Sequence, residues 1–341
     1  MRKSEGRARL TDVARLAGCA PVTVSRFFND PGRVSEDVKR AIEDAIGQLG
    51  YYRNESARVL RSKRSKLVGV VIPTLRHSIY ADMVEGLQRK LATHGFSLIH
   101  NVSDYDLDEE HAQARNLIER GVEAIVLVGT RHRRKTLDML KDSAVTCVVT
   151  YALRDDFQVA SVGFDNHRAA ALAAEKLLAL GHRRFAMIAG ITHDNDRAQS
   201  RVEGFSAALA QAGIPPAELC VREARYDIRE GQAAMADLLD RAPGTTAVFC
   251  GSDVLAVGAL RECRNRGLAV PADISIIGFD NLEISEYTDP PLSTLNVPAV
   301  EMGEEAANYI VQTGPGEAAP KKVELQVGFV PRGTTAAPRQ S

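Results

Sequence analysis

The sequence predicts a small all-α helix-turn-helix domain with a hinge helix, joined to a larger α/β core of two subdomains with parallel sheets and helices on both faces. Residues 1–66 contain short helical patterns and carry 15 lysines and arginines against 8 acidic residues, whereas the remainder carries 28 against 36. After Leu67, short apolar runs alternate with helical segments, which is the pattern of βαβ units. Because this second part is long for a single sheet, we expect two similar subdomains in it.

Three helices are expected in the basic part. Thr11 and Ser35 are good N-caps for the first and third helices, and Pro21 suits the first position of the second. Gly18 and Gly50 end the first and third helices, and "DPG" ends the second. Two short helices joined by a Gly-containing turn and braced by a third form a helix-turn-helix. The expected helices run over residues 12–17, 21–29 and 36–49.

The second helix presents an exposed stripe suited to DNA. Val24 and Phe28 are four residues apart and are expected to face the core, so Val22, Arg26 and Asn29 share the opposite face. In the major groove, an exposed valine can contact a thymine methyl group and an arginine can donate two hydrogen bonds to guanine. The alternative is a solvated basic surface on a small helical cap domain. The DNA-contact candidates here are Thr11, Pro21, Val22, Thr23, Ser25, Arg26 and Asn29, of which Thr23 and Ser25 suit phosphate oxygens.

The segment "YYRNESARVLRSKRSK" follows the three helices and is expected to be a hinge. Asn54 can cap a helix of roughly eight residues, which is too short to be stable alone in water. Such a helix can become ordered on DNA and insert Leu60 into the minor groove as an apolar wedge. Asn54, Ala57 and Leu60 are therefore further DNA-contact candidates, while a flexible linker fits the same composition equally well.

Seven apolar runs are the predicted strands of the core. They are "LVGVVI", "FSLIH", "AIVLVG", "TCVVTY", "FAMIAG", "AVFCG" and "ISIIGF". Helical stretches such as "YADMVEGLQRKLATHG", "AAALAAEKLLALGH" and "VLAVGALRECRNRG" lie between them. The first residues hold no apolar signal segment and no stretch of 18 apolar residues occurs, so we expect a cytoplasmic protein without a membrane span.

The core lacks the sequence signatures of common enzymes. No GxGxxG follows the first strand, and GxSxG, GxxxxGK[ST] and HExxH are absent. "HDNDR" at residues 193–197 can mimic a metal cluster, but a polar loop with a helix-capping aspartate is the favoured interpretation. His77, His132 and His182 are dispersed and are interpreted as surface or capping residues. Five scattered cysteines without a CxxC pair indicate neither a disulfide framework nor a zinc site, and those in apolar runs such as "VTCVV" and "AVFCG" are expected to be buried free thiols. We therefore expect no enzymatic activity, no cofactor and no metal.

The pattern "DVARLAG…TVSRFFN…LGYYRN" makes the chain resemble the lac repressor (LacI/GalR) family of bacterial transcription regulators. The resemblance extends along nearly the whole chain. It implies a DNA-binding helix-turn-helix, a hinge helix that intercalates a leucine, and a core like that of periplasmic sugar-binding proteins. The chain departs from the family at Ala20, where a capping serine is common, and at Pro21-Val22, which replaces polar pairs that bear on base preference.

The same resemblance implies the domain boundaries. Residues 1–53 form the DNA-binding domain, residues 54–66 the hinge and linker, and residues 67–341 the effector-binding and dimerisation core. The chain is expected to cross between the subdomains near Phe164, Leu295 and Gln326. One subdomain then comprises about residues 67–165 and 296–326, and the other about residues 166–295 and 327–335.

Polar residues at strand ends are the candidates for effector binding, because ligands of open α/β sheets bind beyond the carboxyl ends of strands. The resemblance identifies Arg201 as the arginine that grips effector hydroxyls or carboxylates, and Asp280 as the hydroxyl-accepting carboxylate. It also implies that Tyr226 stacks on the effector. A helix cap or an interface ion pair is the alternative role for each such residue. The candidates are Arg76, Ser78, Tyr80, Asn195, Arg197, Arg201, Tyr226, Ser252 and Asp280.

The expected partners are a near-palindromic DNA operator, a sugar or sugar-acid effector and a second copy of the chain. Arg76, His77, Arg197 and Arg201 suit a carboxylate, and "TRHRRKTLDML" and "VGFDN" resemble gluconate-type repressors of the family, so a sugar acid is preferred. Val297 stands where the family usually has an effector-site glutamine. "RGTTAAPRQS" contains no leucine heptad, which favours a dimer over a tetramer. A sugar-binding protein without a regulatory role is the alternative, which the basic front module disfavours.

Overall fold

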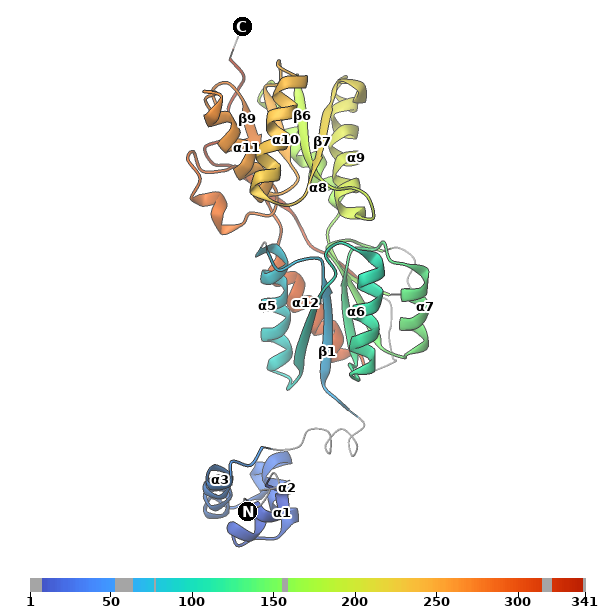
Figure 1. The fold of residues 1–341 in the computed structure, drawn as a ribbon, viewed down its shortest axis with the longest axis vertical. Helices are drawn as coiled ribbons and strands as arrows, with labels where there is room; N and C mark the ends of the chain where they lie inside the picture. Colours follow the sequence, from blue (N-terminus) through green and yellow to red (C-terminus); the bar gives the residue numbers. More distant parts are fainter. Residues whose placement is uncertain (1–7, 53–63, 77, 155–158, 315–320, 340–341) are drawn as a thin grey trace, which may run out of the picture. The chain divides into compact units, whose positions relative to one another are not determined.

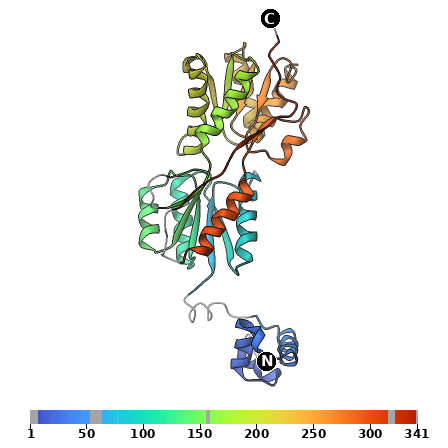
Figure 2. The ribbon, with the colours of Figure 1, turned by 180° about the vertical axis from the view of Figure 1, so that it is seen from behind.

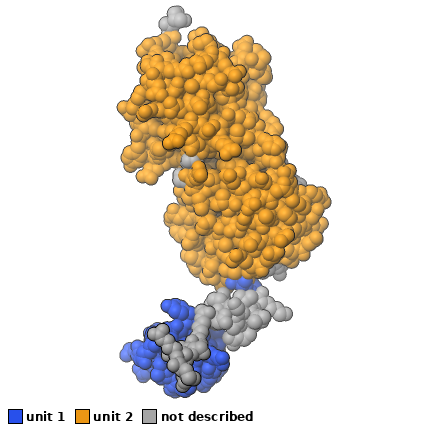
Figure 3. Space-filling view, in the orientation of Figure 1, with its two compact units in different colours: residues 1–65 blue, residues 66–341 orange. Residues whose placement is uncertain are grey.

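The computed structural model describes residues 8–52, 64–76, 78–154, 159–314 and 321–339. The chain divides into two compact units, residues 1–65 and residues 66–341, which are coloured separately in Figure 3. We call them the helical unit and the core unit. Within the described residues, no helix is both long and apolar enough to cross a membrane.

The helical unit packs three α-helices around one small apolar cluster. Its elements are α1 (Leu10–Leu16), α2 (Pro21–Asn29), the 3-10 turn η1 (Pro31–Arg33) and α3 (Glu36–Leu49). Val13, Val24 and Ile42, one from each helix, are fully buried in this cluster. Gly50 ends α3 in the left-handed conformation (φ +56°), which a residue without a side chain adopts at no steric cost.

The first helix begins earlier than the sequence analysis predicted, so the capping role given to Thr11 is wrong. Thr11 lies inside α1, and Arg9 is the N-cap residue. The physical reason is Asp12, whose carboxylate accepts the backbone N–H of Arg9 at 3.0 Å. That carboxylate also lies in the first turn, where it interacts favourably with the helix dipole.

The first subdomain of the core unit is a six-stranded parallel sheet of order β11-β5-β4-β3-β1-β2. Its strands are β1 (Leu67–Ile72), β2 (Ser97–Val102), β3 (Ala124–Val128), β4 (Thr146–Thr150), β5 (Ala160–Gly163) and β11 (Lys322–Glu324). Helices α5 (Ser78–Ala92) and α12 (Ala299–Gln312) cover one face, and α6 (Leu107–Glu119) and α7 (Arg134–Asp142) cover the other (Figures 1 and 2). Successive residues of β1 alternate between the two faces: Val70 packs with α5 and α12, and Val71 with α6 and α7.

The second subdomain is a four-stranded parallel sheet of order β7-β6-β8-β9. Its strands are β6 (Phe185–Gly190), β7 (Cys220–Ala224), β8 (Ala247–Cys250) and β9 (Ser275–Ile277). Helices α8 (Asn166–Ala179) and α9 (Asp196–Gln211) pack on one face, and α10 (Ile228–Arg241) and α11 (Asp253–Asn265) on the other (Figure 1). Two 3-10 turns, η2 (Pro216–Glu218) and η3 (Glu283–Glu286), complete it.

Three chain segments join the two subdomains. The chain leaves the first sheet after β5, returns between β10 (Thr294–Asn296) and α12, and leaves again between β11 and β12 (Gly328–Val330). Strands β10 and β12 pair antiparallel with each other. Residues that follow the carboxyl ends of strands in both sheets line one cavity, so these ends open onto the region between the subdomains, where ligands of such sheets bind.

The seven predicted strands are all present, but the sequence analysis missed five others. Strand β7 ("CVREA") is a half-exposed edge strand and therefore contains charged residues. These residues interrupt the apolar run by which a strand is recognised in the sequence. Strands β10, β11 and β12 are three residues long and β5 is four, too short for a recognisable apolar alternation.

Two histidines are buried, contrary to the prediction that they are surface or capping residues. The His182 ring contacts Thr246 Oγ1 and Ser275 Oγ at 3.0 and 3.1 Å, and burial lowers the pKa of this ring. The side chain of His132 is fully buried against the carboxylate of Glu110 at 2.8 Å. Both rings join segments far apart in the sequence, which explains why no local pattern revealed them. His77 lies outside the described residues.

Candidate functional site

The face of α2 that was predicted to meet DNA is exposed. Val24 is fully buried and Phe28 is half-buried against the same cluster, whereas Val22 is 62% exposed. Arg26 and Asn29 are exposed on the same stripe as Val22. The exposed side chain of Val22 contributes little to the stability of the fold. The stripe that it forms with Arg26 and Asn29 is therefore accessible to a binding partner.

The other described DNA-contact candidates of the helical unit lie on α1 and α2. Pro21 is the exposed first residue of α2, and Thr23 and Ser25 are half-buried on the same helix. Thr11 is exposed on α1. Ala20 is the N-cap residue of α2 and makes no side-chain hydrogen bond to the helix. The hinge candidates Asn54, Ala57 and Leu60 lie outside the described residues.

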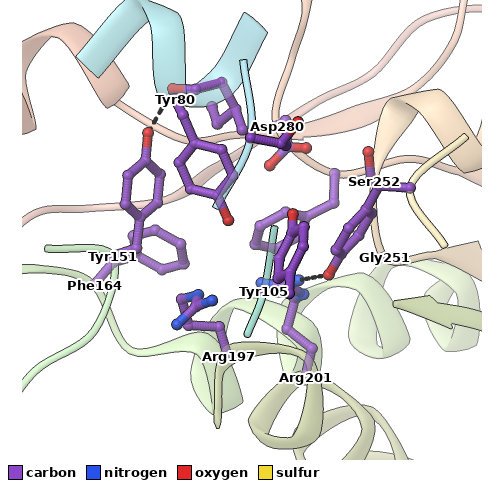
Figure 4. Close-up of a pocket in the computed structure, with 13 residues that line it drawn as sticks. Tyr80, Tyr105, Tyr151, Phe164, Arg197, Arg201, Gly251, Ser252 and Asp280 are labelled. Atoms are coloured by element: carbon purple, nitrogen blue, oxygen red, sulfur yellow. Dashed lines mark hydrogen bonds between the residues drawn. The ribbon is translucent and has the colours of Figure 1, made fainter. Parts of the chain in front are cut away.

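Six of the nine effector candidates line one cavity of the core unit, shown in Figure 4. Tyr80 comes from α5 of the first subdomain, and Asp280 follows β9 of the second. The second subdomain supplies the other four, which are Arg197, Arg201, Tyr226 and Ser252. This inner cavity has a volume of about 40 Å³, far below the roughly 300–1,000 Å³ that ligand pockets usually have.

A larger outer cavity of about 570 Å³ shares some of these residues. Arg76 and Asn195 line the outer cavity and not the inner one. Asn195 also caps α9, because its Oδ1 accepts the backbone N–H of Ala198 at 3.3 Å. The metal-like "HDNDR" segment thus contains a helix cap, supplied by the asparagine rather than by an aspartate. The side chain of Ser78 lies outside the described residues.

Tyr105 and Tyr226 line both cavities and lie between them. Tyr105 follows β2 of the first subdomain, and Tyr226 follows β7 of the second. Their ring centroids are 5.7 Å apart and the ring planes are tilted by 33°. This aromatic pair therefore joins the two subdomains at a place where the inner and outer cavities share lining residues.

Arg201 is held in the inner cavity by neutral groups. Its Nη1 donates to Asn166 Oδ1 at 2.7 Å, and its Nη2 donates to the Tyr226 hydroxyl at 2.8 Å. The guanidinium carbon lies 4.7 Å from the ring centroid of Phe279, a cation–π contact that fixes the plane of the group. Its Nε is buried without a hydrogen-bond partner.

Arg197 has a different environment, because it links the two subdomains. Its Nη1 donates to Asp196 Oδ1 at 2.8 Å and to the backbone oxygen of Val128 at 3.2 Å. The other oxygen of Asp196 accepts the backbone N–H and the hydroxyl of Thr130, both at 2.7 Å. Burial alone would raise the pKa of Asp196, but Arg197 and the Thr130 donors lower it. A Cβ at Gly129 would lie 1.8 Å from the guanidinium, so this loop approaches only because that residue is glycine.

Two carboxyl groups beside the cavity are held toward their neutral form. Burial and the neighbouring Asp253 raise the pKa of Asp280 well above its usual range. Burial likewise raises the pKa of Asp253 to about 7, against hydrogen bonds that lower it. Asp253 accepts the hydroxyl of Thr294 at 2.5 Å and the backbone N–H of Leu282 at 2.7 Å. Asp280 has a φ of +113°, a conformation that L-residues rarely adopt.

Sequence reasoning missed seven lining residues of the inner cavity. Tyr105 and Tyr151 could have been found, because both lie just beyond the carboxyl end of a strand and the strand-end rule was not applied to β2 and β4. The apolar members carry no local signal of ligand binding. The missed residues are Thr74, Ile79, Tyr105, Tyr151, Phe164, Gly251 and Phe279.

Known proteins resemble both units. Residues 9–54 match the domain family described as bacterial regulatory proteins of the lacI family, and residues 174–335 match the periplasmic binding protein-like domain. The HTH-type transcriptional regulator GntR of Pseudomonas aeruginosa is 33% identical over 328 residues, which cover 96% of this chain and 95% of that protein. The chain belongs to the lacI family.

Solved structures of lacI-family proteins have the same fold. The lac repressor dimer bound to operator and the anti-inducer ONPF superimposes with a TM-score of 0.86 at 26% identity, covering 97% of this chain and 100% of that one. A complex of the regulator CelR with cellobiose matches with a TM-score of 0.72 at 30% identity, covering 96% and 100%. As a lacI-family member, the chain is a DNA-binding transcriptional regulator with an N-terminal helix-turn-helix and a two-subdomain α/β core.

Proposed function

We propose that this regulator is a homodimeric repressor whose affinity for operator DNA is controlled by a sugar or sugar-acid effector bound in the inner cavity. The single observation that carries the effector part is the convergence of Arg201, Tyr226 and Asp280 on that cavity (Figure 4). These residues come from separate segments, and structural packing alone gives no reason to gather two arginines and a strained aspartate there.

The DNA part of the proposal rests on the exposed stripe of α2. Arg26 is expected to read guanine and Val22 a thymine methyl group, while Thr11, Pro21, Thr23, Ser25 and Asn29 contact the backbone or neighbouring bases. A twofold dimer presents two such helices about one DNA turn apart, so the operator is expected to be near-palindromic. Leu60 of the hinge is expected to act as a minor-groove wedge, supported by Asn54 and Ala57.

Named relatives support an effector role for the core unit. One similar structure holds cellobiose, another holds ribose, and the lac repressor structure holds the anti-inducer ONPF. We assign effector contacts in this chain to Tyr80, Arg197, Arg201, Tyr226, Ser252 and Asp280, with Arg76 and Asn195 at the outer cavity. Regulation then follows from binding alone, without an enzymatic step, through a coupling free energy of about 1–3 kcal/mol between the two sites.

The test measures operator affinity with and without effector, together with calorimetric effector binding. Arg201→Ala and Asp280→Asn each remove groups that pair with polar atoms of a buried ligand, at a cost of about 1–3 kcal/mol or more. Neither residue belongs to the helical unit, so both variants are expected to bind operator like wild type when effector is not needed for DNA binding. Arg134→Ala, at a side chain of α7 that is 88% exposed and lines neither cavity, is the matched control.

Three outcomes would contradict the proposal. Effector affinity unchanged in both variants would leave Arg201 and Asp280 as structural residues and refute the site assignment. Failure of the wild-type protein to bind any DNA segment specifically would favour the alternative, a sugar-binding protein without a regulatory role. Binding to operator that does not weaken with salt would contradict the expected phosphate contacts.

A further inference from the structure

The loop that follows β3, residues 129–133, is held from within the first subdomain by a buried pair of side chains. Glu110 of α6 and His132 of the loop form this pair, and their side chains are 7% and 0% exposed. His132 Nδ1 lies 2.8 Å from Glu110 Oε1, and His132 Nε2 lies 3.1 Å from the backbone oxygen of Gly129. The ring therefore bridges α6 and the backbone of the loop.

Both ring nitrogens of His132 face oxygen atoms, which fixes the number of protons that the buried pair holds. A backbone carbonyl oxygen only accepts hydrogen bonds, so Nε2 carries a hydrogen. A second proton lies between Nδ1 and Glu110 Oε1, because two lone pairs 2.8 Å apart would repel each other. The pair is thus an imidazolium with a carboxylate or a neutral ring with a carboxylic acid, and either form is neutral overall. Loss of the second proton leaves an uncompensated negative charge in the interior, which is costly.

Gly129 receives the hydrogen bond from His132 and has little freedom to move otherwise. Its N–H donates to the backbone oxygen of Thr150 in β4 at 2.8 Å. Its φ of +87° is a conformation that favours glycine, and a Cβ there would lie 1.8 Å from Nη1 of Arg197. The rotation that remains is that of the peptide unit between Gly129 and Thr130, whose C=O is the acceptor for His132.

The same peptide unit makes the contact with the second subdomain. In a planar trans peptide the C=O and N–H groups point in opposite directions. The C=O of Gly129 accepts from His132, and the N–H of Thr130 donates to Oδ2 of Asp196 in α9 at 2.7 Å. One ring in the first subdomain therefore fixes the direction of a donor that crosses to the second.

We propose that Glu110 and His132 are positioning residues that form a proton-dependent latch, which orients the Gly129–Thr130 peptide and so keeps the two subdomains linked. Without the second proton, the Glu110 carboxylate faces a nitrogen lone pair and the repulsion displaces the ring from Gly129. The peptide then rotates, and the N–H of Thr130 leaves Asp196. This device goes beyond the proposed function, because it requires neither effector nor operator.

The other ionisable groups around the buried pair do not account for such a pH dependence. From α9, Asp196 has a lowered pKa and Arg197 a raised one, so both stay charged. Burial and the neighbouring carboxylate of the pair raise the pKa of the Cys147 thiol in β4 to about 12, so it stays neutral. His111 of α6 directs its ring to the hydroxyl of Thr136 in α7 at 3.2 Å. A link that needs a bound proton weakens as pH rises, which gives the sign of the effect.

The release also reaches the inner cavity. Asp196 Oδ1 pairs with Arg197, which lines that cavity, while Asp196 Oδ2 accepts from Thr130. When Thr130 leaves, Asp196 loses two of the donors that hold it, namely the backbone N–H and the hydroxyl of that residue. The proton content of the pair is thereby connected to the position of a cavity-lining arginine.

Hydrogen exchange of the Thr130 amide in the full-length protein tests the latch. Its protection factor is measured by NMR between about pH 7 and about pH 9.5, and the buried Val126 amide of β3 reports opening of the whole sheet. We expect Thr130 protection to fall about tenfold to a hundredfold over this range, because a hydrogen bond to a charged group is lost. Val126 protection is expected to change little. A fall at Thr130 that is absent, or no larger than at Val126, would overturn the proposal.

Glu110→Gln distinguishes a proton-dependent latch from a structural contact. The amide N–H of the new side chain can donate to Nδ1 of a neutral ring, so both hydrogen bonds of His132 persist at every pH. We expect Thr130 protection in this variant to equal that of wild type at neutral pH and to lose its pH dependence. Glu109→Gln, at an exposed carboxylate of the same helix, is the matched control and should keep the wild-type profile. A wild-type profile in Glu110→Gln would overturn the proposal.

Two substitutions of His132 test which hydrogen bond positions the loop, and they carry the test if Glu110→Gln does not fold. A glutamine amide can reach the place of Nε2, whereas an asparagine amide reaches only that of Nδ1. His132→Gln is therefore expected to retain most of the Thr130 protection, and His132→Asn to lose about tenfold at neutral pH. Protection kept in His132→Asn, or lost equally in both variants, would contradict positioning through the carbonyl of Gly129.

Nitrogen NMR of the histidine rings gives a readout that a purely structural role would not move. The His132 signals of full-length protein labelled with 15N-histidine are assigned by their loss in His132→Gln. We expect Nε2 to carry a hydrogen throughout, and the Nδ1 signal to shift with the same pH midpoint as Thr130 protection. An Nε2 without a hydrogen, or two different midpoints, would overturn the proposal.

Discussion

The exposed stripe of α2 and the inner cavity of the core unit are built in opposite ways. The stripe consists of Val22, Arg26 and Asn29, which lie on one helix within eight residues of sequence. The cavity gathers residues from Thr74 to Asp280. Polar groups of the stripe are exposed to water, whereas those of the cavity are buried and bound to one another. A surface read by a large partner needs only a rigid helix, but a site for a small ligand needs buried groups held by the whole fold.

The largest expected effect is a pH dependence of the free energy of unfolding. It is expected in the core unit, because the buried carboxyl groups lie there. Asp253 has a pKa of about 7 in the folded protein and a usual value of 3.8, so the native state holds an extra proton between these values. The free energy of unfolding of the core unit is therefore expected to fall as pH rises from about 4 to about 7, by up to about 4 kcal/mol.

The variant Asp253→Asn mimics the protonated acid and is expected to reduce this fall, while the part that comes from the raised pKa of Asp280 remains. The measurement is denaturant unfolding at a series of pH values, followed separately for the two units. Asp289→Asn, at a side chain that is 92% exposed, is the control and should keep the wild-type pH profile. A fall of the same size in Asp253→Asn would contradict the assignment to Asp253.

The second prediction uses two valines of α2 to separate folding from DNA reading. Val24→Ala removes two methyl groups from a fully buried side chain and is expected to destabilise the helical unit by about 2–3 kcal/mol. Val22→Ala, on the exposed side of the same helix, should change stability by less than about 0.5 kcal/mol and lower operator affinity instead. Thermal unfolding and DNA titration give the two readouts, and equal stability losses would show that the stripe is part of the core.

The third prediction concerns the link between the two subdomains. Thr130→Val removes the hydroxyl donor to Asp196 but leaves the backbone donor, so a loss of about 1 kcal/mol in the stability of the core unit is expected. Thr93→Val is the control, because the Thr93 hydroxyl bonds only locally, to the backbone oxygen of Lys90 and the ring of His94. Denaturant unfolding measures both. A loss no larger than that of Thr93→Val would show that the two subdomains are not held together by this contact.

The smallest expected effect compares two helix caps, one in each unit. The side chain of Ser35 makes no capping hydrogen bond to α3, whereas the carboxylate of Asp106 accepts the backbone N–H groups of Asp108 and Glu109 at 2.7 and 3.0 Å. Asp106→Ala should therefore cost about 1 kcal/mol and Ser35→Ala less than about 0.5 kcal/mol. The reverse order in thermal unfolding would contradict this comparison of the two caps.

The sequence by itself determined the features that depend on residues close along the chain. The exposure of Val22 and burial of Val24 follow from helical periodicity, and the long strands follow from apolar runs such as "LVGVVI". The start of α1 was predicted too late, because the hydrogen bond from the backbone N–H of Arg9 to the carboxylate of Asp12 was not anticipated. The candidates Arg201 and Asp280 came from the family resemblance, and their convergence on one cavity could not be read from spacing.

Only the tertiary structure decided how those groups are paired. Arg197 and Arg201 are four residues apart on one helix and have the same chemistry, yet Arg197 is paired with Asp196, whereas Arg201 donates to neutral groups and its Nε has no partner. The difference arises because Val128 of the first subdomain accepts from Arg197 and Thr130 holds its partner Asp196, while Tyr226 and Asn166 accept from Arg201. Such pairings depend on distances between segments that are remote in sequence, and periodicity and propensity carry no information about those distances.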